Sequence, residues 1–182
     1  QAALVRLLRT CPGVQTLVVK DGPEMTDQPF DLHIPLLSLP GIFETTAATI
    51  PADVPYLTAE PKLVQQWRMR LGAEQALRVG LVWAGNPSHK NDRNRSCTLA
   101  TLAPLAHLPH LALFSLQTGP AARQIDQPPA GMILHDVGRT LGDFADTAAV
   151  MAHLDLVITV DTAVAHLAGA MGKPVWTLLP FA

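Results

Sequence analysis

Cysteine, aromatic side chains and charge are all scarce in this chain of 182 residues. Charged residues make up 15% of the chain and the formal net charge is -2, so a basic surface for nonspecific nucleic-acid binding is not expected. The two cysteines, Cys11 and Cys97, are too far apart in sequence to suggest a disulfide framework or a zinc site. His107 and His110 flank Pro109, which favours a surface loop over a pair of metal ligands. The sequence therefore predicts no metal site.

Long apolar runs are also missing. No run is long enough to span a bilayer and no signal peptide is visible at the start, so a cytoplasmic location is expected. Hydrophobic residues still make up 48% of the chain, which is enough for a real core. The chain begins with Gln1 and not Met, which favours an excised piece or a processed chain. The length favours one domain, or one domain plus a fragment.

Regular alternation of strands and helices is expected only in residues 76–182. The apolar pattern predicts helices at residues 99–107 and 143–153 and a third helix after Asp161. Five strands are expected, at residues 79–83, 111–116, 132–135, 156–160 and 175–179. This order predicts an α/β fold with a doubly wound, Rossmann-like parallel sheet. The residues expected to be buried in it are Val79, Leu81, Leu113, Ile133, Val157, Ile158 and Val175.

Residues 1–75 lack this alternation. They show the end of a helix at residues 4–8, a strand at residues 14–20 and an amphipathic helix at residues 61–71. Pro61 occupies a first-turn position of that last helix and Gly72 follows its end. We interpret residues 1–75 as the remnant of an upstream domain plus a linker helix.

A candidate ligand site follows the strand at residues 156–160. Asp161 and Thr162 are both good N-capping residues, and the N–H groups of Ala163 and Val164 would point out of the helix end, where a phosphate binds well. His166 lies four residues after Thr162 and so on the same face, one turn deeper. Two alternatives to this ligand site stay open. The Asp161 carboxylate would occupy the same N–H groups as a phosphate if it capped the helix. His166 would equally suit an ordinary half-buried position without a ligand.

Two further loops leave the same edge of the expected sheet. Residues 84–96 form a long loop, A-G-N-P-S-H-K-N-D-R-N-R-S, in which Asn86, Lys90 and Arg95 are the candidate ligand-binding residues. A solvated surface loop is the alternative. Gln117 follows the strand at residues 111–116 and either bonds a polar ligand or caps the next turn. Together these loops would suit an anionic, nucleotide-like ligand.

Several segments resemble one family of enzymes. The segment V-D-T-A-V-A-H-L-A-G-A-M-G-K-P-V resembles the D-T-G-x-x-H-x-x-A-A-x-x-x-P segment of glycosyltransferase family 9, the ADP-heptose:lipopolysaccharide heptosyltransferases. V-G-L-V-W-A-G-N-P, N-D-R-N-R-S, F-S-L-Q-T-G-P and D-F-A-D-T-A-A-V are similar to the heptosyltransferase-like domains that end bacterial tetratricopeptide-repeat proteins, distant relatives of O-GlcNAc transferases. The resemblance covers residues 79–181 and extends to residues 31–57.

The resemblance implies a GT-B architecture, in which two Rossmann-like domains hold the active site between them. Residues 76–182 would be a C-terminally truncated donor-binding domain. Arg95 stands where the heptosyltransferases place a phosphate-binding Lys, and Gln117 falls near an acidic residue that contacts the donor nucleoside there. The donor-contacting positions of the D-T-G-x-x-H pattern fall on Asp161, Thr162, Ala163 and His166. Ala163 replaces the usual Gly and adds a methyl group, and the Gly-rich segment of the family's first domain is absent before residue 75.

The resemblance thus implies a fragment of a sugar-nucleotide-dependent glycosyltransferase with no cofactor beyond the nucleotide-sugar substrate. An acceptor hydroxyl of a protein or saccharide would attack the anomeric carbon; no catalytic residue is assigned. The alternative is a non-catalytic nucleotide-binding or protein-interaction module of a tetratricopeptide-repeat protein. The chain is expected to fold but to be inactive alone. Its incomplete N-terminal segment, residues 1–60, is expected to pack on the second domain or on a second copy in a homodimer.

Overall fold

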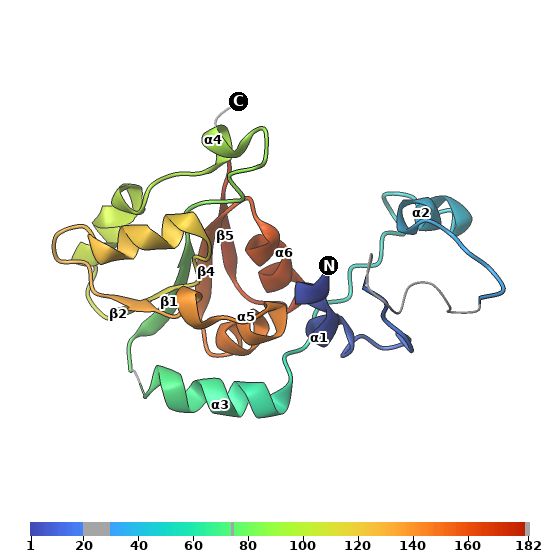
Figure 1. Cartoon of the computed structure of the whole chain (residues 1–182), viewed down its shortest axis with the longest axis horizontal. Coiled ribbons are helices and arrows are strands. Elements are labelled where there is room, and N and C mark those ends of the chain that lie inside the picture. The colour runs from blue at the N-terminus through green and yellow to red at the C-terminus, as the bar shows by residue number, and fades with distance from the viewer. Residues whose placement is uncertain (20–29, 74, 181–182) are drawn as a thin grey trace.

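The computed structural model describes residues 1–19, 30–73 and 75–180, and a five-stranded sheet forms its centre (Figure 1). The strands are β1 (Leu77–Val82), β2 (Leu111–Ser115), β3 (Leu134–Asp136), β4 (Leu156–Val160) and β5 (Val175–Leu178). All neighbouring strands are parallel and their order is β3-β2-β1-β4-β5. This confirms the predicted doubly wound parallel sheet. The chain adds strands on one side of β1 and then on the other, so the topological switch point lies between β1 and β4, where open α/β sheets bind ligands.

The described residues form helices of two kinds. The α-helices are α1 (Val5–Leu8), α2 (Leu39–Ile42), α3 (Pro61–Leu71), α4 (Asp92–Arg95), α5 (Phe144–Met151) and α6 (Ala163–Ala170). The 3₁₀ helices are η1 (Ala2–Leu4), η3 (Leu36–Ser38), η4 (Leu99–His107), η5 (Pro120–Asp126) and η6 (Gly138–Thr140). The helix predicted at residues 99–107 is 3₁₀ and not α, because Pro104 inside it has no N–H to donate.

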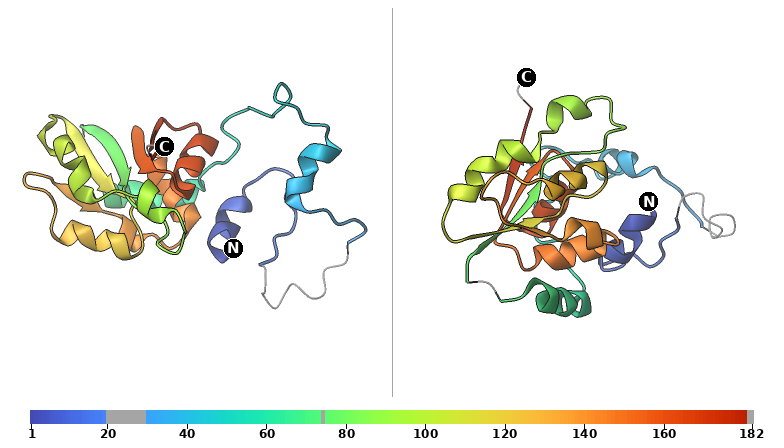
Figure 2. Two further views of the ribbon diagram at one scale, coloured as in Figure 1. Left: turned by 90° about the horizontal axis from the view of Figure 1, so that it is seen from above. Right: turned by 60° about the vertical axis from the view of Figure 1, so that its left-hand side comes forward.

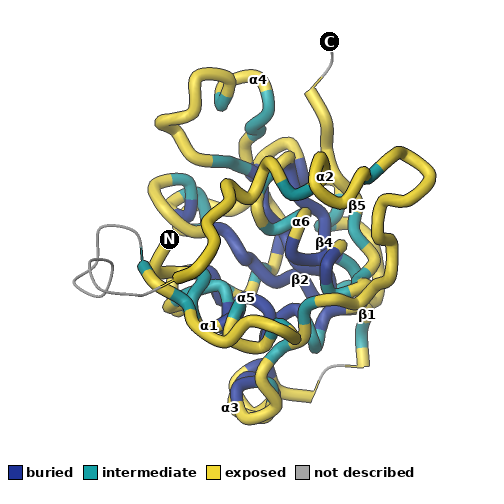
Figure 3. The backbone as a smooth tube through the Cα atoms, turned by 90° about the vertical axis from the view of Figure 1, so that its right-hand side faces the viewer, coloured by how far each residue is buried: buried dark blue, intermediate teal, exposed yellow. Residues whose placement is uncertain are grey.

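The core has two parts, one on each face of the sheet. Val82, Phe114 and Val157 face the cluster that includes α1, α3, α5 and α6. Leu81 and Ile158, adjacent in register, face the opposite cluster, which η4 helps to form. Both faces of the central strands are therefore covered, as expected for a parallel sheet. Figure 3 shows the buried residues concentrated in the central strands β1, β2 and β4 and in α5.

Three strand predictions need correction. Residues 14–19 form no strand, and Lys20 lies outside the described residues; this β-branched run has no neighbouring strand in the structure with which to pair. Ile133 is 79% exposed, because β3 begins one residue later and is a short edge strand. Val175 is only half-buried, because β5 forms the other edge of the sheet. The remaining residues of the predicted core, including Val79, Leu113 and Ile158, are buried as expected.

Two helices of the N-terminal segment, α1 and α3, pack on the sheet domain. Trp67 of α3 is buried, and its Nε1 donates to Asp146 Oδ1 of α5 at 3.1 Å. Arg6 of α1 forms an ion pair with Asp143 at 3.0 Å, directly before α5. The helix predicted at residues 61–71 is confirmed with these bounds. Figure 1 shows α1 beside α5 and α6.

Residues 30–54 extend away from the sheet domain (Figure 2). Leu32 and Leu37 are more than nine-tenths exposed, at 92% and 93%, and Phe43 is 73% exposed. Tyr56 and Leu57 then rejoin the domain, where both backbone N–H groups donate to the Ala170 carbonyl. Within the described ranges, none of the helices combines the length and the apolar character that a membrane crossing requires.

Candidate functional site

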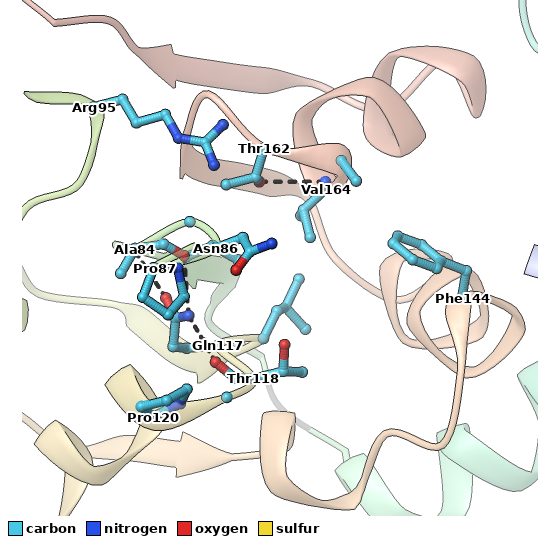
Figure 4. Close-up of a pocket in the computed structure, with 15 residues that line it drawn as sticks. Ala84, Asn86, Pro87, Arg95, Gln117, Thr118, Pro120, Phe144, Thr162 and Val164 are labelled. Atoms are coloured by element: carbon cyan, nitrogen blue, oxygen red, sulfur yellow. Dashed lines mark hydrogen bonds between the residues drawn. The ribbon is translucent and has the colours of Figure 1, made fainter. Parts of the chain in front are cut away.

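A cavity of about 470 Å³ lies at the carboxyl edge of the sheet, at the switch point between β1 and β4 (Figure 4). The loops after β1, β2 and β4 and the start of α5 enclose it. Its lining residues are Val82, Ala84, Gly85, Asn86, Pro87, Arg95, Leu116, Gln117, Thr118, Gly119, Pro120, Phe144, Thr162, Ala163 and Val164. The convergence of three loops on one edge is therefore confirmed.

Thr162 begins α6 at this cavity. Its Oγ1 accepts a hydrogen bond from Val164 N at 3.3 Å and lies 3.1 Å from Thr159 Oγ1. Thr162 is thus the N-cap, and the alternative in which the Asp161 carboxylate caps the helix is wrong. The Ala163 N–H has no acceptor among the described residues, and it lies at the positive end of the helix dipole. An anion at this point would accept a hydrogen bond that the protein itself leaves unmade.

Arg95 ends α4 and brings a positive charge to the same place. Its Nη1 donates to the Asp161 carbonyl at 3.0 Å, and its Nε lies 3.3 Å from Asp92 Oδ1. The side chain is only 15% exposed, so both contacts hold it against the turn between β4 and α6. Of the described residues that line the cavity, Arg95 alone carries a charge. Figure 4 shows its guanidinium beside Thr162.

Gly85 and Ser96 fix the position of this arginine. A Cβ atom at Gly85 would lie 2.6 Å from Arg95 Nη2, so the guanidinium packs directly on the Gly85 backbone. Ser96 Oγ accepts from Gly85 N at 2.9 Å and donates to Asp92 Oδ1 at 3.0 Å. The two ends of the loop at residues 84–96 are thus bound to each other, although its middle is solvated as the alternative interpretation expected.

Gln117 lies in the lining but is 3% exposed. Its carboxamide bonds to the backbone of Trp83, Ala84 and Thr118. It bonds to the following turn only through the Thr118 carbonyl, and its other partners, Trp83 and Ala84, lie directly after β1. Asn86 also lines the cavity, and its Oδ1 accepts from Ser88 N at 3.0 Å.

Three candidate residues lie outside the cavity. Lys90 is exposed in the middle of its loop, and Asp161 is exposed with only its carbonyl turned to Arg95. His166 is exposed and lines a separate apolar cavity of about 210 Å³ between α1 and α6. Its exposure also excludes the half-buried alternative. Four residues advance a helix by about 400°, so His166 is rotated roughly 40° from Thr162, toward α1.

Two residues that the sequence did not nominate shape the cavity. Phe144, at the start of α5, lines both this cavity and the apolar one beside α1. Gly138 lies against the backbone of Gln117, where a Cβ atom would come within 2.1 Å of the Gln117 carbonyl oxygen. The only sequence signal for this close approach was that Gly138 is a glycine between a predicted strand and a predicted helix. That signal does not indicate which residue Gly138 would contact.

Cys97 follows the loop, and its backbone N–H donates to the Trp83 carbonyl at 2.8 Å. Burial raises the pKa of its thiol, although a hydrogen bond with Thr101 opposes this shift. The thiol is therefore protonated at neutral pH and is a poor nucleophile. Within residues 1–19, 30–73 and 75–180, no cluster of three or more His, Cys, Asp or Glu side chains is placed to hold a metal ion.

Residues 137–179 match the sequence model of glycosyltransferase family 9 (heptosyltransferase). This segment runs from η6 to β5 and includes Phe144, Thr162 and Ala163, whereas Arg95 and Gln117 precede it. The chain has no significant match among curated proteins or among solved structures. The family match supports a glycosyltransferase-like function for this chain.

Proposed function

We propose that the cavity binds the diphosphate of a nucleotide sugar and that the chain is the donor side of a glycosyltransferase. The observation that carries the proposal is the position of Arg95, whose Nη1 donates to the Asp161 carbonyl at 3.0 Å, beside the N-terminus of α6. A guanidinium and a helix N-terminus each favour negative charge. The family match at residues 137–179 supports the same reaction class.

The polar and apolar parts of the cavity suit the two parts of such a donor. Arg95, Thr162 and the Ala163 N–H form its polar end, whereas Leu116, Pro120 and Phe144 form apolar walls. The volume of about 470 Å³ is within the usual range for small-molecule sites, and the apolar walls offer surface for a base and sugar.

In the proposed reaction an acceptor hydroxyl of a protein or saccharide attacks the anomeric carbon. A bond between the hydroxyl oxygen and that carbon forms, and the hydroxyl proton passes to water. The bond between the carbon and the diphosphate oxygen breaks, and the leaving diphosphate takes the electron pair. Arg95 and the N-terminus of α6 stabilise the negative charge that develops on the leaving group. The proposal assigns no catalytic base to this chain, and the chain by itself is expected not to transfer sugar.

A calorimetric panel tests this proposal with ADP, UDP, GDP, AMP and CMP. Each diphosphate should bind about tenfold or more tightly than the monophosphates, because the second phosphate adds a charge-assisted contact of about 1.5–3 kcal/mol. Equal affinities for ADP and AMP, or no binding of any diphosphate, would contradict it. Nucleotide binding without sugar transfer by the complete parent protein would favour the non-catalytic module.

Self-association through the N-terminal segment is a separate proposal. The exposed apolar side chains of residues 30–54, such as Leu32 and Leu37, support it, because contiguous exposed apolar surface favours association. We propose that a second copy covers them. Light scattering across a concentration series should show a mass that rises toward the dimer. A mass that stays monomeric throughout would exclude this arrangement.

A further inference from the structure

Gln117 occupies the junction of two loops that enclose the cavity. Its Oε1 accepts from Trp83 N at 3.0 Å and from Ala84 N at 2.9 Å. Its Nε2 donates to the carbonyls of Ala84 at 3.0 Å and Thr118 at 2.9 Å. A carboxamide offers two donors and one oxygen with two acceptor sites, so the protein backbone uses all of its capacity.

We propose that Gln117 is a positioning residue that joins the loop after β1 to the loop after β2, and that it makes no direct contact with the ligand. The inference rests on the proposed diphosphate site and deepens it. Because the buried carboxamide is fully bonded, a ligand contact would have to break a bond that already exists. The side chain acts through the backbone of Ala84.

A continuous series of contacts connects this junction to Arg95. Ala84, held on both its N–H and its carbonyl by Gln117, is followed directly by Gly85. The Arg95 guanidinium packs on Gly85, and Gly85 N bonds to Ser96 Oγ. Ser96 in turn bonds to Asp92, the ion-pair partner of Arg95. Displacement of Ala84 would therefore displace the only charged group in the described lining of the cavity.

The amide, and not merely the size of the side chain, matters at this position. In Gln117→Glu the oxygen that replaces Nε2 would face the carbonyls of Ala84 and Thr118, which Nε2 now contacts at 3.0 and 2.9 Å. This carboxylate oxygen and the two carbonyl oxygens are all acceptors, and without a donor between them they repel one another. The carboxylate must therefore move, and it then releases the N–H groups of Trp83 and Ala84. Gln124→Glu is the matched control, because Gln124 Oε1 accepts from Leu99 N at 2.7 Å and a carboxylate oxygen can do the same outside the cavity.

Two measurements on the full chain test the proposal. In Gln117→Glu the ligand-free amide exchange of Trp83 and Ala84 should accelerate about tenfold or more, and ADP affinity should fall by a similar factor. Gln124→Glu should change neither by more than about twofold. Loss of ADP affinity with unchanged exchange would overturn the proposal in favour of a direct ligand contact. Unchanged exchange and affinity would overturn it as well.

Wild-type protein gives a second measurement if Gln117→Glu does not fold. The side-chain NH₂ protons of Gln117 should exchange slowly without ligand, and their resonances should stay in place when ADP is added. Fast exchange of these protons, or large shifts with ADP, would overturn the proposal. If ADP does not bind to the wild type, the proposed function fails, while the exchange comparison still decides the role of Gln117.

Discussion

Replacement of Arg95 with Ala is expected to weaken ADP binding about 10- to 100-fold, because a charge-assisted contact with phosphate is worth about 1.5–3 kcal/mol. The side chain is 15% exposed and held by Asp92 and the Asp161 carbonyl, so little entropy is lost when it meets a ligand. Isothermal titration calorimetry at constant ionic strength measures the change.

Arg93→Ala is the matched control for this experiment. Arg93 lies in the same helix, α4, but it is exposed and does not line the cavity. Its removal changes the net charge by the same amount, so it should reduce ADP affinity no more than about twofold. If both variants lose affinity equally, the effect is one of overall charge and the specific role of Arg95 is refuted.

The second large effect is expected at Gly138. A Cβ atom there would lie 2.1 Å from the carbonyl oxygen of Gln117, and this neighbour is backbone, which cannot rotate away. Gly138→Ala should therefore lower the free energy of unfolding by about 1–3 kcal/mol, the usual cost of overpacking. Urea denaturation followed by circular dichroism measures this difference.

Gly169→Ala provides the comparison. Gly169 lies in α6, and a Cβ atom there would meet nothing within 4 Å. Alanine at this position should raise the free energy of unfolding by about 0.5–1 kcal/mol through its better helix propensity. A Gly138→Ala protein as stable as the wild type would show that the backbone of Gln117 can move, and that the cavity is less rigid than its contacts indicate.

Local sequence patterns were sufficient to predict β4 and the start of α6, which carry part of the candidate site. The β-branched run at Leu156–Val160 and the capping hydroxyl of Thr162 predicted β4 and the start of α6, because strand burial and N-capping depend on neighbours in sequence. Arg95 lies in the lining of the cavity, because loops that follow parallel strands meet at one edge of the sheet. Its predicted contact with a phosphate stays a prediction.

The errors arise where partners distant in sequence decide the outcome. Residues 14–19 have the composition of a strand but no neighbouring strand, and Ile133 lies just before an edge strand that is too short to include it. The ligand contact predicted for Gln117 stays untested, but the bonds of its side chain to Trp83 and Ala84, more than 30 positions earlier in the chain, could not be predicted. Neither periodicity nor spacing contains that information.

The central claim is that a diphosphate binds between Arg95 and the N-terminus of α6. The most direct test is a backbone amide NMR titration of the full chain with ADP. The account predicts the largest shift at the Ala163 N–H, which has no acceptor among the described residues. A second cavity, at the amino edge of the sheet, is lined by Arg68, Arg78 and His153. Shifts concentrated there, with Ala163 unchanged, would contradict the account.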